Sequence, residues 1–71
     1  MRANRVYDLR VNRHRGAPDS IEVLEIDTGE IALFWDLLPH QTGRMARALR
    51  ADLVQLEDRE FLAKWSRYQT G

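Results

Sequence analysis

The sequence contains no cysteine, so it can form no disulfide, no thiolate metal site and no cysteine nucleophile. Small secreted domains usually depend on disulfides, and their absence leads us to expect a cytoplasmic protein. Long apolar runs are also missing: the longest, residues 31–38, is interrupted by Asp36, and no stretch of signal-peptide length follows the N-terminus. We therefore expect neither secretion nor a membrane-spanning segment.

Lysine is almost absent, because ten of the eleven basic side chains are arginine and Lys64 is the exception. We interpret this bias as the codon usage of a GC-rich bacterial genome. The formal net charge is zero, but residues 1–16 carry five arginines and one acid, whereas residues 17–40 carry six acids and no basic side chain. Such a distribution is typical of a basic segment that binds polyanions, and equally of a basic strand paired with an acidic one.

The chain has 71 residues, which predicts one domain over residues 1–71 with frayed ends at 1–4 and 69–71. Apolar residues make up 44% of the sequence, enough for a folded core. A monomer of this size buries only about 60–65% of the surface of its unfolded chain. Self-association would therefore add useful stability.

Three strands are expected, over residues 5–13, 20–27 and 30–36. Tyr7, Leu9 and Val11 alternate with polar residues, which is the period of a half-buried strand. In the second segment the apolar parity changes near Val23, where we predict a β-bulge. Residues 27–29, Asp-Thr-Gly, predict a three-residue hairpin turn in which the glycine adopts positive φ.

Two amphipathic helices are expected after the strands, over residues 39–55 and 57–68. Pro39 suits the first turn of a helix because it lacks an N–H group. The first helix should bury Met45, Leu49, Leu53 and Leu56, and the second should bury Phe61, Leu62, Trp65 and Tyr68. Glu60 and Lys64 are spaced for an exposed ion pair. The predicted fold is α+β: a three-stranded antiparallel β-meander followed by these two helices.

No sequence motif indicates chemistry. A P-loop, a dinucleotide fingerprint, a His-Glu-x-x-His helix and an EF-hand loop are all absent. His14 and His40 have no acidic or histidine neighbour at metal-ligand spacing, and Glu22, Glu25, Asp27 and Glu30 are ordinary for a surface hairpin. We predict no catalytic, metal-binding or cofactor-binding residue and no small-molecule ligand. An active site built at a dimer interface is the one enzymatic alternative.

Residues 31–38 suggest a binding surface, because helices cover only one face of a two-layer domain. If Ile31, Leu33 and Trp35 pack under the helices, then Phe34 projects from the opposite face. Together with Leu24 and Ile26 it would form an exposed apolar patch. We predict a homodimer or another protein partner for this patch, and the role of an accessory or regulatory subunit. In the alternative, Phe34 is a lone exposed aromatic or is covered by residues 1–4.

A second candidate surface lies on the first helix, where Arg44, Arg47 and Arg50 form a band with no acid four residues away. It favours a nucleic-acid-binding module as the runner-up function. The zero net charge opposes this, since phosphate neutralisation supplies most of such affinity. We also expect the arginines of the first strand, Arg10 and Arg13, to pair with Glu22 or Glu25 on the second.

Overall fold

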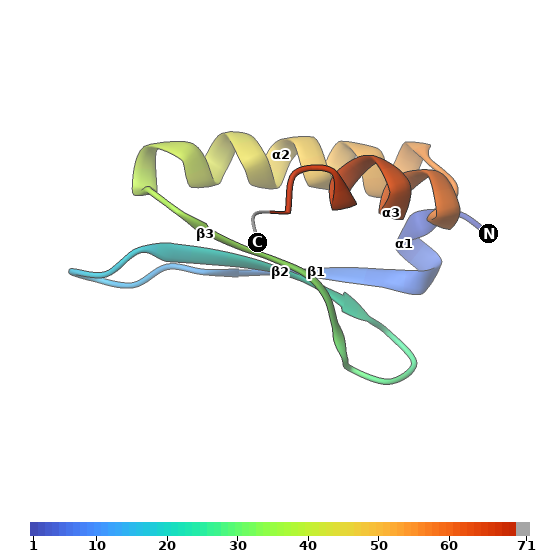
Figure 1. Cartoon of the computed structure of the whole chain (residues 1–71), viewed down its shortest axis with the longest axis horizontal. Helices are drawn as coiled ribbons and strands as arrows, with labels where there is room; N and C mark the ends of the chain where they lie inside the picture. The colour runs from blue at the N-terminus through green and yellow to red at the C-terminus, as the bar shows by residue number, and fades with distance from the viewer. Residues whose placement is uncertain (70–71) are drawn as a thin grey trace.

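The computed structural model describes residues 1–69 and has an α+β architecture (Figure 1). Three strands form an antiparallel sheet in the order β1-β2-β3: β1 Tyr7–Asn12, β2 Asp19–Glu25 and β3 Ile31–Leu37. The helices are α1 Ala3–Val6, α2 Pro39–Gln55 and α3 Asp58–Ser66. The predicted meander followed by two amphipathic helices is confirmed, and α2 has the bounds expected from the sequence.

Both long helices lie on the same side of the sheet, and no helix of the described residues lies on the opposite side (Figure 1). The core therefore forms between one face of the sheet and the apolar stripes of α2 and α3. Its fully buried members include Ile21 and Val23 of the central strand, Leu49 of α2 and Phe61 of α3. Burial of these side chains is the main stabilising contribution to folding.

Aromatic contacts join α3 to the sheet. Phe61 stacks on Tyr7 at a centroid distance of 5.8 Å, and Trp65 meets Trp35 edge-on at 6.0 Å. Trp65 also donates from its indole nitrogen to Asp52 of α2 at 3.0 Å. Tyr68, which the helical pattern placed in the core, is exposed instead, because α3 ends at Ser66 and the chain turns there.

The N-terminal residues form a helical turn where the sequence predicted a frayed end and the start of the first strand. Ala3 is fully buried, and its N–H donates to the carbonyl oxygen of Leu56 at 2.9 Å. Arg2 donates to the carbonyl of Gln55 at 2.7 Å. These bonds anchor residues 1–6 to the connection between α2 and α3, so β1 begins at Tyr7. Residues 70–71, also expected to fray, lie outside the described residues.

The predicted ion pair between Glu60 and Lys64 does not form. Lys64 instead contacts Asp52 of α2 at 2.6 Å, and the ammonium lies 5.4 Å from the centroid of the Trp65 ring. Asp52 also accepts the Trp65 bond, so a partly buried carboxylate attracts the lysine more strongly than an exposed neighbour one turn away. This contact ties α2 to α3.

Candidate protein interface on the open face of the sheet

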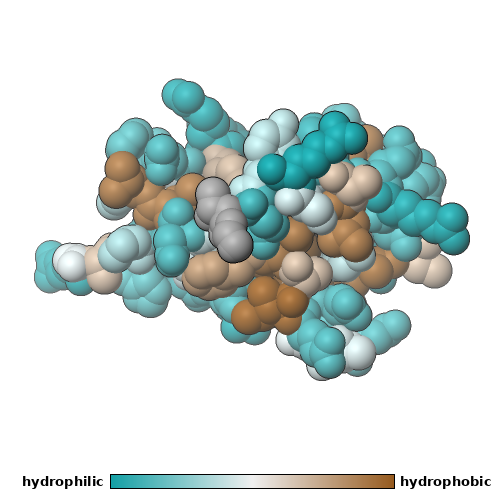
Figure 2. Space-filling model, viewed as in Figure 1, coloured by the Kyte–Doolittle hydropathy of each residue, from teal (hydrophilic) through white to brown (hydrophobic). Residues whose placement is uncertain are grey.

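The side of the sheet opposite the helices, called the open face here, is built from residues that the strand register places in rows. Arg10, Glu22 and Phe34 form one row across the three strands. Asn12, Ser20 and Asp36 form the next, and Leu24 pairs with Ile31 on the other side of Phe34. Figure 2 shows a small apolar area near the middle of the lower side of the molecule, with hydrophilic surface on both sides of it.

A β-bulge decides which apolar side chains reach the open face. The register shifts between Val23 and Leu24, as predicted from the parity change, and the extra residue lies on β3. One step along β2 matches two steps along β3, so Val23 faces Leu33 in the core while Leu24 faces Ile31 on the other side. The expectation that Ile31 packs under the helices was wrong: it is 54% exposed.

The three predicted interface residues differ in accessibility. Phe34 is 43% exposed and Ile26 is 52% exposed, so both can contact a partner directly. Leu24 is only 9% exposed, because it belongs to the central strand and side chains of both neighbouring strands surround it. Ile31, which the sequence assigned to the core, adds a second exposed apolar side chain on β3, opposite Leu24. The exposed apolar set is therefore Ile26, Ile31 and Phe34.

Glu22 is nearly buried in the middle of the open face, and its charge is compensated there. Its carboxylate accepts a 2.8 Å hydrogen bond from Asn12 and lies 3.5 Å from the guanidinium of Arg10. The predicted pairing of Arg10 with an acid of the second strand is confirmed. A partner covering this face would therefore not isolate a buried charge.

The outer edge of β3 is partly occupied by the end of the chain. The side-chain amide of Gln69 accepts from the N–H of Phe34 at 3.1 Å and donates to its carbonyl at 2.9 Å. It takes the position that a peptide group of a fourth strand would take. Because the edge is capped at Phe34, a partner is expected on the face of the sheet and not along this edge.

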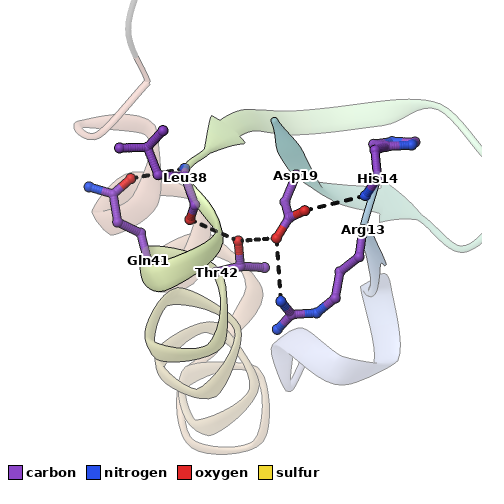
Figure 3. A network of polar contacts seen from close by, with 6 residues as sticks. All are labelled: Arg13, His14, Asp19, Leu38, Gln41 and Thr42. Carbon is purple, nitrogen blue, oxygen red and sulfur yellow. Dashed lines mark hydrogen bonds and ion pairs between the residues drawn. The ribbon is translucent and has the colours of Figure 1, made fainter. Parts of the chain in front are cut away.

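Arg13 pairs with Asp19, not with Glu22 or Glu25, at the other end of the sheet (Figure 3). Asp19 is 2% exposed and accepts a 2.7 Å hydrogen bond from the hydroxyl of Thr42 in the first turns of α2. It also accepts from the backbone N–H of His14. The Thr42 bond, with support from His14 and Arg13, lowers the pKa of Asp19 below its usual range. Sequence reasoning missed this network because 23 residues separate Asp19 from Thr42.

The three arginines of α2 line two different hollows. Each step of three residues turns about 300° around a helix, so successive members of the series rotate by about 60°. Arg47 and Arg50 face the hollow between α2 and β1, beside Val11 and Arg13. Arg44 lines a different hollow with His40 and Leu37. Within residues 1–69, none of the three forms an ion pair.

A comparison with protein-family models, curated proteins and solved structures finds no match for this chain. Within residues 1–69, no helix is long and apolar enough to cross a membrane. The same part of the chain holds no group of three or more His, Asp or Glu side chains arranged to bind a metal ion.

Proposed function

We propose that this chain is a protein-binding accessory or regulatory domain of the cytoplasm whose first partner is a second copy of itself. The observation that carries the proposal is the exposure of Phe34 and Ile31 on a sheet face that no helix covers. Both are large apolar side chains on adjacent rows, and Ile26 extends the patch beyond the end of β2. Contact between two such patches removes apolar surface from water.

The charges of the open face support a second copy as the partner. Arg10 lies on β1, at one edge, and Asp36 lies on β3, at the other. A two-fold axis parallel to the strands would place β1 of one copy over β3 of its partner. Arg10 would then cover the ring of Phe34 and approach Asp36, which is exposed and has no ion pair within residues 1–69. Such a contact is self-complementary, as a symmetric dimer requires.

The area of the open face limits the expected affinity of the dimer. Six strand residues span about 20 Å and three strands about 14 Å, so each copy can bury on the order of several hundred Å². Stable interfaces bury about 800 Å² per partner. The proposed dimer is therefore weak, with a dissociation constant of about micromolar or higher.

The direct test is sedimentation equilibrium of the Phe34→Ser variant. Its dimerisation should weaken by about tenfold or more, because one apolar ring is lost from each copy at the centre of the contact. Val54→Ser is the matched control, since Val54 is 57% exposed on α2, away from the open face. Equal association of the two variants, or collapse of the fold in Phe34→Ser alone, would contradict the proposed interface.

A further inference from the structure

The hollow between β1 and the first half of α2 is lined by small or apolar residues and by three arginines. Its volume is about 460 Å³, and it is open to solvent. Val11, Gly43 and Ala46 are the small or apolar lining residues, and the guanidinium groups belong to Arg13, Arg47 and Arg50. From its position and charge we infer that this hollow binds a phosphate group.

Arg47 and Arg50 give the hollow an uncompensated positive charge, because neither forms an ion pair within residues 1–69. They are neighbours on one helix face, at a spacing of three residues, where like charges lower helix stability by a few tenths of a kcal/mol. The repulsion is relieved when an anion lies between the two groups. A bound anion would therefore offset this repulsion.

Arg13 completes the hollow from the sheet side and is already held in place. One guanidinium nitrogen lies 3.3 Å from the carboxylate of Asp19, which is fixed in turn by Thr42 (Figure 3). The other terminal nitrogen lies beside Gly43, where it would be 3.9 Å from an added Cβ atom. This nitrogen therefore lies close to the backbone of α2, on the side of Arg13 that faces the hollow. A guanidinium fixed before binding loses less conformational entropy when it contacts a ligand.

The ligand class follows from the donors. Guanidinium groups present paired N–H donors whose geometry matches two oxygens of a phosphate. Two uncompensated arginines match the charge of one phosphate ester. The acids of residues 17–40 add a negative field elsewhere on the molecule, which disfavours contact between a long polyanion and that part of the surface. The phosphate can belong to a small phosphate ester or to a nucleic-acid strand. The site is independent of the proposed dimer, because it lies on the helical side of the sheet.

The inference is tested by titrating the chain with inorganic phosphate, with a mononucleotide and with a short single-stranded oligonucleotide, followed by amide NMR shifts. Shifts at Val11, Arg13 and residues 43–50 are expected. The double variant Arg47→Gln/Arg50→Gln should weaken binding about tenfold or more. The control Arg59→Gln/Arg67→Gln removes the same charge from exposed positions at the two ends of α3 and should retain the affinity within about twofold.

The three probes distinguish the sources of the phosphate. Similar affinities for the mononucleotide and the oligonucleotide assign a small phosphate ester. Tighter oligonucleotide binding that falls linearly with the logarithm of salt concentration assigns a nucleic-acid backbone. Equal weakening in the two double variants shows a general charge effect and overturns the inference. An absence of shifts around the hollow with all three probes also overturns it.

Discussion

Arg10 and Phe34 lie in the same row of the open face, one on each edge strand, with only Glu22 between them. Arg10 is attached to Glu22 by an ion pair, whereas Phe34 leaves 43% of its surface in water. The row therefore has a cationic end and an aromatic end. A two-fold axis parallel to the strands would place Arg10 of each copy against Phe34 of the other. This contact is the basis of the proposed self-association.

The charge arrangement predicts that Asp36→Arg weakens dimerisation. In the two-fold arrangement this change would place an arginine near Arg10 of the partner, and like charges at close range repel. The fold should be unaffected, because Asp36 is exposed and unpaired within residues 1–69. Asp27→Arg, in the β2–β3 turn, makes the same charge change away from the rows. Sedimentation should show weaker association for Asp36→Arg only; identical behaviour of the two variants would exclude the two-fold arrangement described above.

The bulge predicts opposite outcomes for two residues of β3 that lie two positions apart. Leu33 is 3% exposed in the core, so Leu33→Ala should lower the free energy of unfolding by about 2–5 kcal/mol. Ile31 is on the open face, so Ile31→Ala should cost less than about 1 kcal/mol and should weaken dimerisation. Urea denaturation measures the first effect and sedimentation the second. A larger loss of stability for Ile31→Ala would mean that the register shift is misplaced.

The Asp19 network predicts an acid-dependent part of the stability. The pKa of Asp19 is lower in the folded state than in the unfolded state. The charged carboxylate therefore stabilises the folded state. This contribution is fully present above the unfolded pKa of about 4 and is lost as the pH falls towards the folded value. Thr42→Val removes the main cause of the shift, so the variant should lack part of this contribution.

Urea denaturation at pH 7 and near pH 2 measures the difference in unfolding free energy between the original chain and Thr42→Val. We expect a larger difference at pH 7 than in acid, where protonation of Asp19 removes the contribution of its charged form. A difference that does not change with pH would show that the Thr42 hydroxyl contributes through packing alone. Thr42→Ser, which keeps the hydroxyl, serves as the control for the pH effect.

The aromatic contacts predict that Phe61 is essential to the fold. Phe61 is fully buried between Tyr7 and Trp65. Phe61→Ala should lower the free energy of unfolding by about 3–5 kcal/mol, a large share of the stability of so small a domain. Thermal unfolding followed by circular dichroism is the measurement. A shift of the midpoint by only a few degrees would mean that α3 contributes little to the core.

Local patterns in the sequence were sufficient for most of the fold. The alternation around Leu9 predicted β1, the Pro39 start predicted α2, and Gly29 adopts the positive φ, 74°, that the Asp-Thr-Gly turn requires. These features depend on residues close together in the chain, where period and turn chemistry are informative. The position of the bulge was also indicated by the parity change at Val23.

Contacts between distant segments were not predicted. The parity of Ile31 alone placed it in the core, because a bulge reverses the face of every residue beyond it and the sequence does not say which strand holds the extra residue. The backbone N–H of Ala3 donates to the carbonyl of Leu56, which holds this residue near the core. The hydroxyl of Thr42 donates to the carboxylate of Asp19, 23 residues away in the sequence. Leu24 was placed on the correct face, but its shielding by neighbouring strands depends on the assembled sheet.

The solution mass of the unmodified chain tests the central claim most directly. Light scattering after size exclusion, at low and at high salt and from about 10 µM to about 1 mM, should show a mass that rises from one chain towards two. Because the contact is mainly apolar, the rise should be nearly the same at both salt concentrations. A mass of 8.3 kDa at every concentration would contradict self-association through the open face.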